Sequence, residues 1–138
     1  MLDPLEPVLN YLLQDTELTA LVGNRIAAKH RYGKGWQTSQ AALTVLLDGG
    51  TPDIYVPMQV VRLETRAFAA SQADAMQIWR RLIEIARRTQ RVTAPTTQGN
   101  ALVYWMNQAS GPSMVFDQDI GVDSVLCFFE AAVGESAI

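Results

Sequence analysis

Few residues of this chain have the types and spacing that catalysis or metal binding requires. His30 is the only histidine and Cys127 the only cysteine. A serine or cysteine nucleophile would need His30 beside it as a base, and this histidine lies in a glycine-containing segment that we interpret as a loop. One histidine and one cysteine do not supply the three protein ligands of a usual zinc site. We therefore predict no catalytic residue, no metal and no cofactor, and a protein that is not an enzyme.

Three aspartates, Asp117, Asp119 and Asp123, follow one another in a pattern that faintly resembles a calcium-binding loop. In such a loop oxygen ligands recur at fixed positions and a bidentate glutamate closes the site. Here Gly121 stands where the third ligand is needed and Phe128 where the glutamate is needed. We interpret the segment as a solvated acidic loop or as a loop that contacts another protein.

A cationic and aromatic segment, Lys29 to Gln40, contains Arg31, Tyr32, Lys34 and Trp36. Its two glycines and its lack of apolar periodicity predict a long mobile loop. Interleaved cations and aromatic rings can bind single-stranded nucleic acid or phosphate. The whole chain is acidic, however, with a net charge of −3 and a pI of about 5.0, whereas domains that grip nucleic acid are usually basic. We therefore favour contact with protein over contact with nucleic acid.

The clearest element is a helix from Ser71 to about Arg91. Ser71 is a suitable N-cap, and Asp74 lies three residues further on, as the acid of a capping box does. The face opposite the apolar stripe is basic, and we interpret it either as solvated or as a contact with a neighbouring subunit. The apolar residues recur with the spacing of one helical stripe and are Ala75, Ile78, Trp79, Leu82, Ile83 and Ala86.

Hydrophobic patterning predicts further elements on both sides of this helix. Apolar stretches that follow Asp3 and Asp15 predict two short helices, the second ended by Gly23. In Met58 to Phe68, apolar and charged residues alternate, which predicts a half-buried antiparallel strand. Other strands are predicted at 25–29, 41–47, 101–108 and 122–133, with turns or loops at 48–53, 92–100 and 110–121.

Together these elements predict an α+β fold in a single domain that spans residues 1–138. We expect an antiparallel sheet, or a mixed one, of about four strands. One long helix and the short N-terminal helices would pack on one face of this sheet. Residues 29–40 would form a mobile loop and residues 134–138 a frayed tail.

The sequence also bears on the compartment. A single cysteine excludes an internal disulfide, no apolar run is long enough to span a membrane, and the N-terminus lacks the basic region of a signal peptide. We expect a protein that folds in the cytoplasm and has no membrane partner.

The stretch from Leu9 to Ile26, LNYLLQDTELTALVGNRI, resembles the opening of the small tail-completion or tail-terminator proteins of long-tailed, siphovirus-type bacteriophages. In that family a short helix precedes the pattern D-x-x-L-x-x-L-V-G-x-R-I, which here begins at Asp15. The length of 138 residues and the later order of two strands, a helix and two terminal strands also agree. The segment Lys29 to Gln40 departs from the more compact, proline-containing passage that is usual in the family.

This resemblance implies a structural virion protein without an active site. It would form a ring, typically a hexamer, at the head-proximal end of the tail, where it ends polymerisation of the tail tube and joins the tail to the head–tail connector. Its partners would be further copies of itself, the tail tube protein and the connector protein, with DNA only passing through the lumen. It would reach this place in the virion after assembly in the host cytoplasm.

Charge on half-buried elements and the predicted loops suggest which residues such a ring would use. The candidates for subunit interfaces are Arg62, Glu64, Arg66, Arg80, Arg81, Arg87 and Arg88. The candidates for contact with the tube or the connector are Arg31, Tyr32, Lys34, Trp36, Asp53, Tyr55, Phe116, Asp117 and Asp119.

Other interpretations stay open. The chain could be another neck component, such as a head-closure or connector protein, which is also a small ring on the same axis. It could instead be a small ligand-binding domain, which would need a pocket with convergent polar groups. It could also bind nucleic acid through the cationic segment at 29–40.

Overall fold

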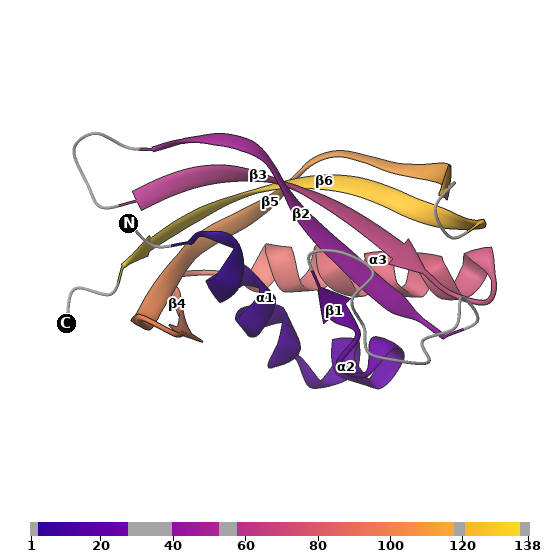
Figure 1. Ribbon diagram of the computed structural model, residues 1–138, viewed down its shortest axis with the longest axis horizontal. Coiled ribbons are helices and arrows are strands. Elements are labelled where there is room, and N and C mark those ends of the chain that lie inside the picture. Colours follow the sequence, from indigo (N-terminus) through magenta and orange to yellow (C-terminus); the bar gives the residue numbers. More distant parts are fainter. Residues whose placement is uncertain (1–2, 28–39, 53–57, 118–120, 136–138) are drawn as a thin grey trace.

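Most of the described chain is β-structure. The computed structural model describes residues 3–27, 40–52, 58–117 and 121–135 (Figure 1). The helices are α1 (Leu5–Leu13), α2 (Thr16–Val22) and α3 (Gln72–Arg88). The strands are β1 (Ile26–Ala27), β2 (Ala42–Pro52), β3 (Met58–Phe68), β4 (Val92–Thr96), β5 (Gly99–Asp117) and β6 (Val122–Glu135).

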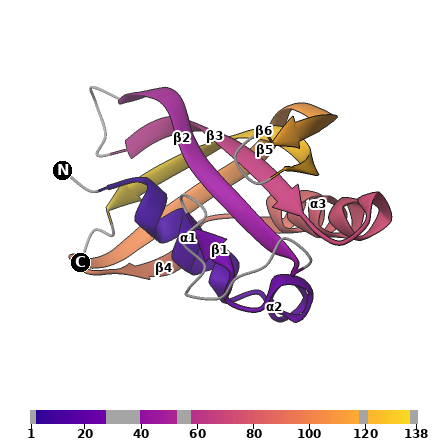
Figure 2. The same cartoon turned by 45° about the vertical axis from the view of Figure 1, so that its right-hand side comes forward.

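The strands form one mixed sheet that curls into half of a barrel. Its order is β1-β2-β3-β6-β5-β4. β1 runs parallel to β2, and every other neighbouring pair is antiparallel. The curl creates a concave side, which we call the inner face, and a convex side, the outer face (Figures 1 and 2). α1, α2 and α3 lie on the concave side, where α3 contacts β3, β5 and β6 and α1 contacts β4.

The prediction of an α+β fold with about four strands is wrong. The protein is mostly β, with a six-stranded sheet and three helices among its described residues. Within the predicted turn region at 92–100 only residues 97–98 form a turn, while the rest forms β4 and the start of β5. The predicted loop at 110–121 mostly extends β5. Both segments contain residues of weak strand propensity, among them Pro95, Gly99 and Pro112, and their pairing with neighbouring strands decides their structure.

Helix α1 holds the β4–β5 hairpin through polar contacts that sequence spacing does not reveal. Asn10 Nδ2 donates to the carbonyl oxygen of Pro95 over 2.7 Å. The carboxylate of Glu6 accepts the backbone N–H of Thr97, in the hairpin turn, over 2.6 Å. These bonds join the first helix to a late part of the chain, so they form only when the sheet is in place.

β2 continues through Asp48, Gly49 and Gly50, where the sequence predicts a turn. The pairing of β2 with β3 shifts register between Leu47 and Gly50, which marks a bulge. Gly50 has a φ of +148° and lies so close to β3 that an added Cβ would come within 2.7 Å of the Cα of Val61. Glycine therefore lets this strand continue past residues that usually end one.

The predicted alternation of β3 is confirmed, and β6 alternates in the same way beside it. Leu63 and Phe129 pair across the two strands, and both are fully buried on the inner face. Glu64 and Phe128, the next pair, lie on the outer face and are half-buried. The inner face therefore supplies the sheet's half of the hydrophobic core.

Helix α3 begins where the sequence predicts. The hydroxyl of Ser71 accepts the N–H of Asp74 over 3.2 Å and caps the helix. The helix ends at Arg88, before the predicted end near Arg91, because the chain then turns into β4. Its apolar stripe packs into the core, where Ala75, Ile78, Leu82 and Ala86 are buried and Trp79 and Ile83 are half-buried.

The predicted frayed tail and the predicted mobile loop lie mostly outside the described residues. β6 includes Gly134 and Glu135, the first residues of the predicted frayed tail, and residues 136–138 lie outside the described ranges. All of the predicted mobile loop at 29–40 except Gln40 also lies outside the described ranges.

Replacing Gly50 by alanine should destabilise the protein more than replacing Gly49. Both glycines have positive φ, +148° and +95°, which costs an alanine about 1 kcal/mol. Only a Cβ at Gly50 would collide with the backbone of Val60 and Val61, whereas nothing lies within 4 Å of one at Gly49. In urea unfolding we expect losses of about 2–4 kcal/mol for Gly50→Ala and about 1 kcal/mol for Gly49→Ala. Equal losses would contradict the close approach of β2 and β3.

Candidate assembly surfaces

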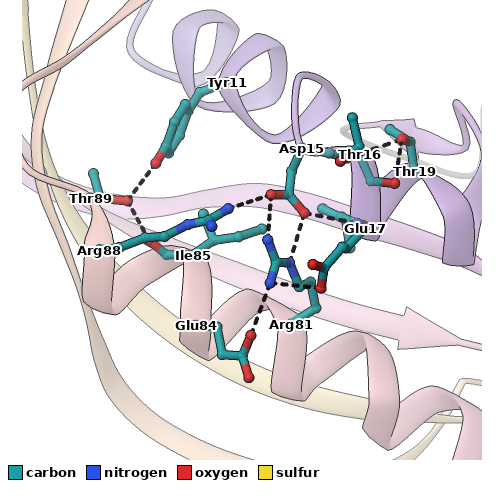
Figure 3. Close-up of polar contacts among 11 residues, drawn as sticks. Tyr11, Asp15, Thr16, Glu17, Thr19, Arg81, Glu84, Ile85, Arg88 and Thr89 are labelled. Atoms are coloured by element: carbon teal, nitrogen blue, oxygen red, sulfur yellow. Dashed lines mark hydrogen bonds and ion pairs between the residues drawn. The ribbon is translucent and has the colours of Figure 1, made fainter.

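The turn between α1 and α2 carries a buried carboxylate, Asp15, that two arginines of α3 bind (Figure 3). Asp15 caps α2 by accepting the N–H of Leu18 over 2.8 Å. Arg81 donates to both of its oxygens, from Nε and Nη2, over 2.8 Å each, and Arg88 Nη2 donates over 2.5 Å. The side chains of Asp15 and Arg81 are only 8% and 10% exposed. This forked, charge-assisted pair holds the two helices in one relative orientation.

The charges of this cluster are balanced within the chain. The hydrogen bond from Arg81 is the largest cause that lowers the pKa of Asp15 below its ordinary value of 3.8, and it outweighs burial, which acts the other way. The same bond raises the pKa of Arg81. Arg81 Nη1 also lies 2.9 Å from carboxylate oxygens of Glu17 and Glu84. Arg81 is therefore a structural residue that binds α2.

The predicted basic face of α3 divides into two parts. Arg81 points into the protein, and Arg88 is 58% exposed but bonded to Asp15. Arg80 and Arg87 are exposed and form no ion pair with any described residue. Among the four predicted interface arginines, Arg80 and Arg87 are thus the two that are placed to meet a neighbouring protein with an unbalanced charge.

The outer face of the sheet carries the other predicted interface residues, and each of them pairs with an oppositely charged residue of the same chain. Arg62 Nε lies 3.1 Å from Asp48 Oδ2, and the guanidinium carbon lies 4.5 Å from the centre of the Phe128 ring. Arg66 Nε lies 2.7 Å from Glu64 Oε1. The Arg62–Asp48 pair is exposed and contributes little stability, and both pairs cover an apolar part of the outer face with charge.

Most of the predicted contacts with the tube or the connector lie outside the described residues. These are Arg31, Tyr32, Lys34, Trp36, Asp53, Tyr55 and Asp119. Phe116 and Asp117 are described, and they form the end of β5, in the β5–β6 hairpin. The side chain of Phe116 is 58% exposed, which is unusual for an aromatic residue in a strand and makes it a candidate contact.

Leu47 and Met114 are exposed apolar residues that sequence patterns did not single out. They are 45% and 40% exposed. Leu47 pairs with Leu63, and Met114 pairs with Val125. The side chains of Leu63 and Val125 are buried on the inner face, so those of Leu47 and Met114 point to that side too. Phe116, two residues after Met114, also points there. The short apolar run at 114–116 was the available signal for Met114, but it lies in a segment rich in loop-forming residues.

The described residues offer little for catalysis. None of them forms a group of three or more His, Cys, Asp or Glu that could hold a metal ion. Cys127 is buried, and burial raises the pKa of its thiol, which disfavours the reactive thiolate. An open groove of about 370 Å³ lies between α2 and α3, with Leu21, Gln77 and Arg80 in its lining. His30 lies outside the described residues.

Comparison with known proteins finds no family model that matches this chain and no curated protein of similar sequence. Within the part of the chain that the structure describes, no helix is long and apolar enough to cross a membrane.

Removing the carboxylate of Asp15 should strongly destabilise the protein. Asp15→Ala leaves Arg81 buried without its main partner and removes the cap of α2, so we expect the free energy of unfolding to fall by about 3 kcal/mol or more. Asp48→Ala is the matched control, because it removes the partner of Arg62 from an exposed pair and should cost less than about 1 kcal/mol. Similar losses in urea unfolding would contradict a special role for Asp15.

The contribution of Asp15 should depend on pH in a defined direction. Its folded-state pKa lies below the unfolded value near 3.8, so its stabilisation is fully present above that value and is lost as the pH falls through the folded-state pKa. Asp15→Asn keeps a capping oxygen but removes the charge. The difference in the free energy of unfolding between the wild type and this variant should be constant between about pH 5 and 7 and shrink below about pH 4. A difference that stayed the same at about pH 2 would contradict the lowered pKa.

Proposed function

We propose that this chain is a structural protein of a long-tailed bacteriophage, a tail terminator that forms a ring at the head-proximal end of the tail tube. The observation that carries the proposal is the segment from Asp15 to Ile26, whose pattern resembles the opening of that family. The ring would stop polymerisation of the tube and join the tail to the head–tail connector.

The residues of this pattern form one structural unit in the protein. Asp15 caps α2 and binds α3, while Leu18 is buried in the core. Gly23 ends the helix with a φ of +63°. Arg25 Nε then donates to the carbonyl oxygen of Ala41 over 2.7 Å, which joins the helix pair to the start of β2. Asp15, Leu18, Gly23 and Arg25 thus each have a structural role, which supports an architecture shared with the family. The proposed function is taken from that family.

Exposed apolar side chains also support assembly with other protein chains. Leu47, Met114 and Phe116 leave a large part of their apolar surface in water, whereas most predicted interface charges are balanced within the chain. Apolar surface of this kind is usually covered by a partner. The net charge of −3 suits a ring through which DNA passes, because an acidic wall repels phosphates and does not retain them.

The test is the mass of the protein by light scattering, alone and with the tail tube protein of the same particle. We expect a species of about six 15.2-kDa chains in at least one condition, and shorter tubes when the protein is present during tube polymerisation. A monomer in both conditions, with no effect on tube length, would contradict the proposal. Binding to head-side connector proteins without binding to tube protein would favour a head-closure role instead.

A further inference from the structure

We propose that copies of this chain join edge to edge, with β5 of one copy pairing with β2 of the next in an antiparallel arrangement. The partner is a second copy of the chain, and the contact extends the curled sheet from one subunit to its neighbour. This inference rests on the proposed ring and names the strands that close it.

Within the described ranges, β2 and β5 each have an edge that is unpaired over part of its length. β1 pairs with β2 only at Leu43 and Thr44, and β4 pairs with β5 only as far as Val103. Among the described residues, no strand pairs with β2 at 46–52 on the edge away from β3. Likewise, none pairs with β5 at 105–117 on the edge away from β6. Unpaired backbone groups along a strand edge readily pair with another strand.

On β2, the exposed apolar side chain belongs to a residue whose backbone faces the open edge. The N–H of Leu43 donates to the carbonyl of Arg25 over 2.9 Å, which shows that Leu43 directs its backbone groups to the side of β1. Alternate residues of a strand direct these groups to the same side, and the pairing of β2 with β3 is regular from Leu43 to Leu47. Leu47 therefore directs its N–H and C=O to the open edge, beyond the end of β1.

On β5, Met114 and Phe116 likewise combine an exposed apolar side chain with backbone groups that face the open edge. The carbonyl of Val115 accepts the hydroxyl of Ser124, on β6, over 3.1 Å, so Val115 directs its backbone groups into the sheet. Its neighbours Met114 and Phe116 then direct theirs to the open edge. Leu47, Met114 and Phe116 are the exposed large hydrophobic residues of the described protein, and the backbone groups of all three face an open edge.

The two edges match in direction and in face. β2, β3, β6 and β5 alternate in direction across the sheet, so β5 runs antiparallel to β2. Opposite residues of an antiparallel pair have their side chains on the same side. Leu47, Met114 and Phe116 all point to the inner face, so the pairing brings these side chains together and continues the inner face of one copy into the next.

The covered parts of the two edge strands do not obstruct this contact. β1 covers the first residues of β2, and β4 covers the first residues of β5. When the open parts align antiparallel, β1 and β4 lie at opposite ends of the shared pair. Because the two edges are different surfaces of one chain, the contact is heterologous, and repetition of it closes into a ring when the rotation between copies allows.

Cross-linking between two different variants tests the pairing directly. Leu47→Cys and Phe116→Cys chains are assembled together, with tail tube protein when assembly requires it, and treated with a short bis-maleimide. We expect a linked dimer in the mixture and little in either variant alone, because the two edges meet only between copies. Ser113 is exposed on the outer face of the same strand, so Ser113→Cys is the matched control for Phe116→Cys. The wild-type chain controls for cross-links through the buried Cys127.

A charge on the open edge should weaken the association. Phe116→Lys places a charge among apolar side chains at the contact, and we expect the apparent dissociation constant of the assembly to rise at least about tenfold. Ser113→Lys adds the same charge on the other face of β5 and should change it little. Urea unfolding of both variants checks that the fold is intact.

The outcomes separate this inference from the proposed function. An assembly that forms without the mixed link, or a link from Phe116→Cys to tube protein instead, overturns the edge pairing and leaves the ring proposal in place. A mixed link in an assembly that neither binds tube protein nor limits tube length supports the edge pairing and overturns the tail function. A protein that stays monomeric alone and with tube protein overturns both.

Discussion

The arrangement of the helices depends on one carboxylate, that of Asp15. It caps α2 and accepts bonds from Arg81 and Arg88, so α2 cannot separate from α3 without leaving a buried charge unpaired. From Asp15, further contacts connect the helices to both edges of the sheet. Arg25, three residues after α2 ends, bonds to Ala41, just before β2. α1, which precedes Asp15, holds the β4–β5 hairpin. The ion pair thus positions the two segments that cover parts of the sheet edges.

Because β1 and β4 are short, this positioning also decides which parts of the edges stay open. Natural proteins usually protect edge strands with prolines, charges or a covering element. Here β4 contains Pro95, but the later parts of β2 and β5 carry exposed apolar side chains on the inner face. An edge of this kind is a liability in a solitary subunit and an interface in an assembly.

The structure leaves fewer charged residues available for subunit contacts than the charge pattern of the sequence indicates. Most arginines that a linear pattern assigns to subunit contacts bind carboxylates or an aromatic ring of their own chain, as Arg62 and Arg81 do. Arg80 and Arg87 are the exceptions among those described. Association in the proposed ring would then depend on apolar contact and backbone pairing at the strand edges, with charge acting at the periphery.

The sequence by itself determined the features that depend on neighbours a few residues away. The Ser71 cap, the apolar stripe of α3, the alternation of β3 and the helix end at Gly23 were all predictable, because capping and periodicity are local. Only the tertiary structure decided that the polar segments at 92–100 and 110–117 become strands, that Arg81 turns inward to Asp15, and that Leu47 and Met114 stay exposed. These features depend on partners that are distant in sequence, which local propensity cannot identify. Phe116 was predictable as a contact residue, but its place on an open strand edge follows from the pairing of β5 with β6.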